Sequence, residues 1–223
     1  MAEVPEKLPF MGTSCCPAWS VMAKKLFPEY ADCISMTMTP MVLTARLLKK
    51  DHPDARICFV GPCSAKKLEA SRRSVRSEVD FVLTFEELMG LFEAKAVDFA
   101  ALPDNPEDSF NSASADGRGF AVSGGVAQAV VNAIKKIDPD REVKVASAQG
   151  LSDCRKMMMM AKAGKYNGYL LEGMACPGGC IAGAGTLADP AKSAAMLNKY
   201  KTEAPMKNST ETPYKDSIGL LKY

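Results

Sequence analysis

Residues 56–67 read RICFVGPCSAKK, and this stretch decides the fold class. Residues 56–60 form a short run that is continuously apolar after Arg56, which is typical of a buried parallel strand. The run ends at Gly61 and Pro62, and we expect a helix of about two turns to follow Cys63. A strand that turns through Gly and Pro into a helix is the repeating unit of parallel α/β folds.

The same alternation of strand and helix continues along the chain. Strands are predicted at 81–84, 143–148 and 168–172. Helices are predicted at 17–27, 40–50, 85–94, 126–136, 152–163 and 190–200, and Thr84 with Glu87 forms a capping box before one of them. The pattern predicts an α/β fold with a mostly parallel sheet flanked by helices. We expect a polar lead at 1–12, one domain at 13–200 with a long loop at 101–118, and a polar C-terminal tail at 201–223.

Composition excludes several classes of function. The chain has 223 residues, of which 47% are hydrophobic, so it is long enough to bury a core. Its formal net charge is +2, and its 28 Lys and Arg residues are spread along the chain, which argues against a nucleic-acid partner. No apolar stretch is long enough to span a membrane, and the first residues lack the apolar core of a signal peptide. We therefore expect a cytoplasmic protein.

Cysteine usage points to metal or redox chemistry. The chain contains eight cysteines, and a cytoplasmic setting argues against a disulfide framework. Five of them lie in three motifs: TSCCPAW at 13–19, GPCSAKK at 61–67 and EGMACPGGC at 172–180. Ligand sites of parallel α/β folds form at the carboxyl ends of strands, and helix N-termini lower the pKa of a nearby thiol. These turns therefore predict a site for a soft metal or an iron–sulfur cluster.

The three motifs resemble the signature motifs of the di-iron (FeFe) hydrogenases in composition, order and spacing. The stretches 83–88 and 120–125 are similar to the same family, and the resemblance runs from about residue 10 to residue 190. It implies an H-cluster-binding domain that corresponds to one lobe, with its cluster-binding segments, of the hydrogenase catalytic domain.

The resemblance implies a set of ligands and a cofactor. Cys16, Cys63, Cys176 and Cys180 would hold a 4Fe–4S cluster. Cys180 would also bridge to a di-iron subcluster that carries CO, cyanide and a bridging dithiolate. Lys66 would donate hydrogen bonds to a cyanide ligand.

The resemblance also implies a proton path and a cavity wall. Cys15 would be the proton-transfer thiol; the alternative is an inert buried thiol. Ser35 and Glu69 match polar positions of that path. The residues implied to shape the cavity are Pro62, Phe120, Ser123 and Met174.

The activity implied is reversible proton reduction and H₂ oxidation by a ferredoxin-dependent hydrogenase. Ferredoxin or a similar carrier would supply electrons directly, and radical-SAM maturation proteins would install the cofactor. The chain starts just before the first cysteine motif, so the upstream lobe of the family is expected to be absent. A fragment, a subunit completed by a second subunit or lobe, and a minimal enzyme remain as interpretations.

Two alternatives stand beside the hydrogenase reading. The first is a non-catalytic or H₂-sensing iron–sulfur relative, and the second is structural zinc at the four cysteines. Other residues are interpreted as structural. His52 is expected in an exposed turn, Cys33, Cys58 and Cys154 in packing positions, and the four methionines at 157–160 partly in the core and partly on the surface.

Overall fold

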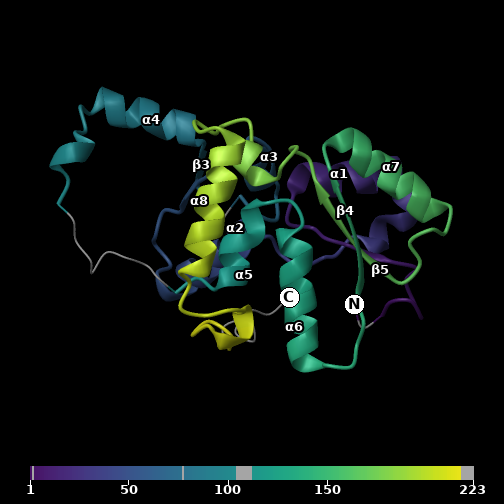
Figure 1. Ribbon diagram of the computed structural model, residues 1–223. Helices are drawn as coiled ribbons and strands as arrows, with labels where there is room; N and C mark the ends of the chain where they lie inside the picture. Colours follow the sequence, from purple (N-terminus) through teal and green to yellow (C-terminus); the bar gives the residue numbers. More distant parts are fainter. Residues whose placement is uncertain (2, 77, 104–111, 217–223) are drawn as a thin grey trace.

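The computed structural model describes residues 1, 3–76, 78–103 and 112–216 and contains two parallel sheets (Figure 1). In the first sheet β5 (Tyr169–Met174) lies between β1 (Met11–Gly12) and β4 (Lys144–Gln149). In the second, β2 (Cys58–Val60) pairs with β3 (Phe81–Leu83). Every pairing between these strands is parallel, which confirms the predicted fold class.

The predicted helices are present with ends displaced by no more than two residues. The α-helices are α1 (Pro17–Leu26), α2 (Pro40–Asp51), α3 (Ala65–Ala70), α4 (Phe85–Ala94), α5 (Ala115–Arg118), α6 (Gly125–Ile137), α7 (Leu151–Lys162) and α8 (Pro190–Thr202). The 3₁₀ helices are η1 (Pro28–Cys33), η2 (Phe99–Ala101), η4 (Gly119–Ala121), η5 (Cys180–Ala182) and η6 (Ser209–Glu211). The capping box of Thr84 and Glu87 is confirmed, because both of its hydrogen bonds form.

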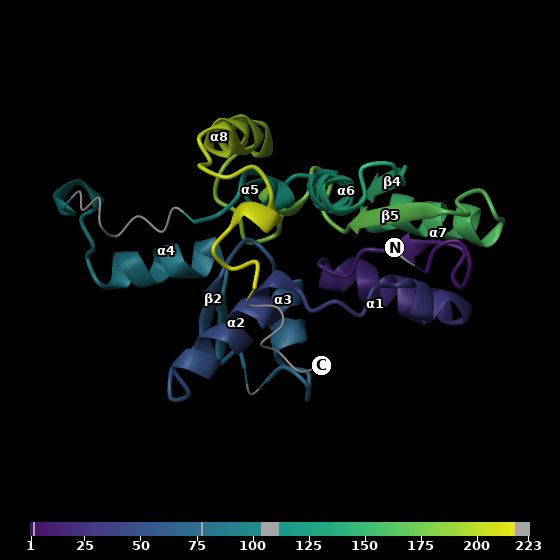
Figure 2. The same cartoon turned by 90° about the horizontal axis from the view of Figure 1, so that it is seen from below.

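The main core lies between the first sheet and the helices α1 and α7. Leu171 of β5 packs there against Trp19 and Met158, and all three side chains are fully buried. Successive side chains of a strand point to opposite faces, so Glu172 faces the other side, where it contacts the N-terminus of α6. Helices therefore cover both faces of β5. Figure 2 shows α1 and α6 on opposite sides of that strand.

Expectations for the isolated cysteines and methionines were largely met. Cys33 and Cys154 are buried, as predicted, and His52 is exposed at the end of α2. The methionine run divides as predicted: Met157 and Met158 are buried and Met159 is exposed. Cys58 is the exception, because it is exposed rather than packed.

The exposure of Cys58 is one sign that the second sheet is less buried than the sequence predicted. The strand predicted at 56–60 was expected to be buried, but β2 is shorter and both of its end residues are exposed. Among the described residues its sheet has only two strands, so neither strand has neighbours on both edges. The following helix α4 is apolar, yet none of its residues is buried. Figures 1 and 2 both show α4 extending away from the rest of the molecule.

The segments expected as lead, loop and tail carry more structure than predicted. Val4 and Phe10 of the expected polar lead are buried, because the lead brings β1 to the edge of β5. The loop predicted at 101–118 contains α5, and its residues 104–111 lie outside the described part. Part of the tail packs on α5: the amide of Ala115 donates to the carbonyl of Met206 at 2.8 Å. Residues 217–223 of the tail are also outside the description.

Asp80 joins the second sheet to α2. Its carboxylate accepts from the amide of Ile57 at 2.8 Å and from Arg56 at 3.0 Å, and Lys49 lies 3.1 Å away. These partners, the Ile57 amide above all, hold the pKa of the carboxyl well below its usual range. A depressed folded-state pKa stabilises the fold above the unfolded-state value of about 4, and this stabilisation is lost as the pH falls through the folded-state value.

We expect Asp80→Asn to lower the midpoint of urea unfolding at pH 7, because the anion that these donors bind is removed. The difference from wild type should shrink at pH values below about 4, because Asp80 of the unfolded chain then takes up a proton that the native carboxylate still resists. Urea titrations at pH 7 and pH 3 measure it. A difference that stays constant between these two pH values would contradict this assignment.

No helix in the described part of the chain has the length and apolar character needed to cross a membrane.

Candidate metal centre

The three cysteine motifs meet where elements of both sheets end. Cys16 directly precedes α1, and Cys63 lies between β2 and α3. Cys176 and Cys180 follow β5 and flank a turn in which Gly178 and Gly179 both have positive φ values. Glycine adopts such angles without steric cost, which explains why the chain can reverse between the two thiols.

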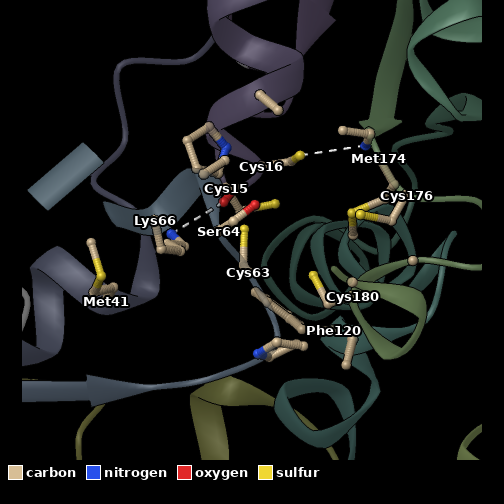
Figure 3. Close-up of a pocket in the computed structure, with 18 of the residues that line it drawn as sticks. Cys15, Cys16, Met41, Cys63, Ser64, Lys66, Phe120, Met174, Cys176 and Cys180 are labelled. Carbon is tan, nitrogen blue, oxygen red and sulfur yellow. Dashed lines mark hydrogen bonds between the residues drawn. The ribbon is translucent and has the colours of Figure 1, made fainter. Parts of the chain in front are cut away.

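All five motif cysteines line one cavity of about 380 Å³. In Figure 3 the sulfur atoms of Cys16, Cys63, Cys176 and Cys180 surround the same space. Its wall is mostly apolar. The other residues predicted for the site that line it are Pro62, Lys66, Phe120 and Met174.

Close backbone contacts fix the cysteine turns relative to one another. The amide of Gly185 donates to the carbonyl of Pro62 at 3.0 Å, which ties the segment after Cys180 to the turn before Cys63. A Cβ atom at Gly183 would collide with that same carbonyl oxygen. The amide of Ala175 approaches Sγ of Cys16 at 3.5 Å. Segments that are far apart in the sequence therefore form the cavity together, and these contacts hold them in place.

Burial and mutual repulsion keep several of these thiols protonated. Burial raises the pKa of the Cys15 thiol to about 12, and the nearby Cys16 and Glu172 add to the effect. Burial and the other three ligand candidates raise the pKa of Cys180 to about 11. Burial, together with the nearby Cys63 and Cys16, also raises the pKa of Cys176. The four thiols are therefore close enough to interact electrostatically.

The donor set suits an iron–sulfur cluster. Thiolates are the usual ligands of such clusters and also of structural zinc. Among the described His, Cys, Asp and Glu side chains, however, no group of three is arranged to hold one metal ion. The four thiols line one cavity and supply the four cysteine ligands that a 4Fe–4S cluster takes. The residues present therefore fit a 4Fe–4S cluster at Cys16, Cys63, Cys176 and Cys180.

Lys66 and Glu69, both predicted for the site, are paired. Nζ of Lys66 lies 2.8 Å from Oε2 of Glu69, and both side chains are almost fully buried. The other carboxylate oxygen of Glu69 accepts from the hydroxyl of Thr39 at 2.8 Å. Glu69 thus contacts Lys66 rather than Cys15, and the resemblance alone did not indicate this pairing.

The predicted serines Ser35 and Ser123 lie outside the wall of the cavity as the described residues form it. The hydroxyl of Ser35 donates to the hydroxyl of Thr37 at 2.9 Å, in an exposed segment. Ser123 contributes its backbone, and its amide donates to the carbonyl of Gly178 at 3.1 Å. Ser123 therefore helps to hold the turn between Cys176 and Cys180.

Sequence reasoning missed Glu172 as a supporting residue. Its fully buried carboxylate accepts from the amides of Gly124 and Ala127 at the start of α6. Burial raises the pKa of this carboxyl, while the two amides act in the opposite direction. A charged residue inside the apolar strand β5 was the available signal. Its contacts join the start of α6, which follows Phe120, to β5, which precedes Cys176.

An α/β fold with a thiol-lined cavity at the ends of parallel strands defines a class of iron–sulfur-binding proteins. Residues 1–184 match the family described as the C-terminal domain of the iron-only hydrogenase large subunit. The chain belongs to this family.

Curated relatives include both enzymes and assembly factors. The periplasmic Fe hydrogenase large subunit of Nitratidesulfovibrio vulgaris is 30% identical over 82% of this chain and 53% of its own length. Cytosolic iron-sulfur assembly component 3 of Bos taurus is also 30% identical, over 85% of this chain and 49% of its own length. The chain thus spans about half the length of these relatives.

Solved structures show the same fold. A variant of the FeFe-hydrogenase HydA1 from Chlamydomonas reinhardtii superposes with a TM-score of 0.71 at 21% identity. The match covers 96% of this chain and 73% of that chain. At 21% identity this likeness supports the assignment of the fold alone. The chemistry has to be inferred from the residues of the site.

Proposed function

We propose that the protein is a hydrogenase that interconverts protons and H₂ at a di-iron subcluster linked to a 4Fe–4S cluster. The observation that carries the proposal is the cavity in which Lys66 and a fifth thiol, Cys15, accompany four ligand thiols. A cluster that serves only for structure or assembly needs four ligands. It gives no reason for an additional thiol and a buried cation on the same wall.

Each group on the wall has a task in this proposal. Cys16, Cys63, Cys176 and Cys180 would hold the 4Fe–4S cluster, and Cys180 would also connect the protein to the di-iron subcluster. When bound, the di-iron group with its CO, cyanide and dithiolate ligands supplies the redox chemistry. Cys15 holds a proton at Sγ and passes it between the cavity and the protein surface. The apolar side chains of Phe120 and Met174 exclude water, which strengthens electrostatic contacts in the cavity.

Electrons enter from ferredoxin or a similar carrier in this proposal, and radical-SAM maturation proteins install the subcluster. All eight cysteines are free of disulfides, which fits a cytoplasmic setting. A second subunit or lobe completes the protein, in keeping with relatives that are about twice as long.

A non-catalytic iron–sulfur protein is the second candidate. It is favoured by relatives such as the cytosolic Fe-S cluster assembly factor NAR1 of Phaeosphaeria nodorum, 34% identical over 42% of this chain. Anaerobic reconstitution with iron and sulfide, followed by a synthetic di-iron mimic, separates the two. H₂ evolution supports the hydrogenase. An intact 4Fe–4S spectrum without H₂ evolution favours the second candidate.

The role of Cys15 gives a sharper test. We expect Cys15→Ala to lower H₂ evolution by about 100-fold or more, in the range that a positioned proton-transfer group contributes. The 4Fe–4S spectrum should persist, because Cys15 is not one of the four ligands. Ser14→Ala is the matched control, since the Ser14 hydroxyl donates to the carbonyl of Thr37 instead. Full activity in Cys15→Ala would refute the proton role.

A further inference from the structure

Three side chains from two segments form a buried hydrogen-bonded chain that ends at the cavity. Thr39, at the N-cap of α2, donates its hydroxyl to one carboxylate oxygen of Glu69 at 2.8 Å. The other oxygen lies 2.8 Å from Nζ of Lys66, and that ammonium also approaches the carbonyl of Cys15 at 3.5 Å. Figure 3 shows Lys66 directed toward Cys15 from one side of the pocket.

Burial makes this chain different from an ordinary surface ion pair. The side chains of Lys66 and Glu69 are 10% and 5% exposed. Buried charges are costly unless they are paired and their remaining hydrogen-bonding atoms are satisfied. Thr39 satisfies the carboxylate oxygen that Lys66 does not use. The carboxylate is therefore held from both sides and fixes the direction of the ammonium.

The ammonium retains capacity for a further partner. A lysine ammonium has three donor hydrogens, and Glu69 and the Cys15 carbonyl account for two of them among the described contacts. Lys66 also lines the cavity, whereas Glu69 and Thr39 stand behind it. The Lys66 ammonium therefore faces the cavity, and the Glu69 carboxylate lies behind it, away from the cavity.

We propose that Glu69 and Thr39 are positioning residues that hold the Lys66 ammonium at the cavity wall for an anionic or strongly dipolar ligand of the bound metal group. This inference rests on the proposed function for the identity of that ligand. In this proposal Glu69 positions Lys66, whereas the resemblance implied that Glu69 belongs to the proton path. It also adds Thr39, which the sequence did not single out.

Lys67 provides a matched control within the same helix. It pairs with Glu87 at 2.7 Å, but those two side chains are 43% and 44% exposed. Exposed pairs contribute little to structure. Glu87→Gln therefore removes the carboxylate partner of the neighbouring lysine, away from the cavity, while the glutamine oxygen can still accept from the Thr84 amide in the capping box.

The first measurement needs no di-iron group. In the full chain labelled with ¹⁵N at lysine Nζ, a buried, bonded ammonium gives a slowly exchanging NMR signal, assigned by its loss in Lys66→Arg. We expect the signal to persist in Glu87→Gln and Thr39→Ser, and to broaden or vanish in Glu69→Gln and Thr39→Val. Unfolding midpoints recorded alongside separate this effect from a general loss of fold. An unchanged Lys66 signal in Glu69→Gln would overturn the inference.

The second measurement uses protein loaded with the synthetic di-iron mimic. Glu69→Gln and Thr39→Val should retain the mimic about 10- to 100-fold less well and shift its cyanide infrared bands, as for other outer partners of metal sites. Thr39→Ser and Glu87→Gln should match wild type. Unchanged bands and retention in Glu69→Gln would also overturn the inference. If wild type takes up no mimic, the proposed function fails, and the NMR measurement alone decides whether Glu69 and Thr39 hold Lys66.

Discussion

Replacement of Cys63 by alanine is expected to abolish the 4Fe–4S cluster. Cys63 is the only one of the four ligand candidates that comes from the second sheet, directly after β2. Without its thiolate the remaining ligands come from the first sheet and its flanking segments, and one iron loses its protein ligand. The loss should exceed the roughly 10- to 100-fold that removal of an outer partner costs a metal site. Iron content and the visible absorption of the anaerobically reconstituted protein measure it.

Cys58→Ala is the matched control for this experiment. Cys58 lies five residues earlier at the start of β2, is exposed, and lies outside the cavity wall formed by the described residues. It should keep the full iron content of the wild type. A Cys63→Ala protein that retains the cluster, or equal losses in both variants, would contradict the ligand assignment.

The sequence was sufficient for those features that local patterns encode. The strand that ends at Val60, the Gly-Pro turn and the helix after Cys63 follow from apolar runs and turn residues, so their positions could be predicted. The motifs also led to the cavity, because the carboxyl ends of parallel strands bring separate turns together. The helix ends could also be predicted, because the residues at each end encode them. The capping box of Thr84 and Glu87 is an example.

Other features depend on contacts between segments that no local pattern records. Thr39 and Glu69 are thirty residues apart, and only the folded chain brings their side chains together. The exposure of Cys58 depends on how many strands its sheet contains, which an apolar run of four residues cannot specify. Glu172 was quoted within a motif, but its two amide partners lie more than forty residues away.

Gly173→Ala is expected to destabilise the protein strongly, although it adds a single methyl group. An added Cβ would lie 2.6 Å from Cε2 of Trp19 and closer still to two neighbouring ring atoms. Trp19 is fully buried, and its indole N–H donates to the carbonyl of Thr13 at 3.0 Å, so the ring has no free path away. Overpacking of this kind costs about 1–3 kcal/mol. The displaced ring would also move the start of α1, where Cys16 lies.

A double-mutant cycle and a second glycine establish the cause. Trp19→Phe removes part of the ring, so Gly173→Ala combined with it should cost less than the sum of the two single changes, by about 0.5–3 kcal/mol in urea unfolding. Gly90→Ala on α4 is the control, because no atom outside its own helix lies within 4 Å of the added Cβ. There the change should stabilise the protein by about 0.5–1 kcal/mol through helix propensity. Strictly additive costs in the cycle would show that the indole ring is not what excludes a side chain at Gly173.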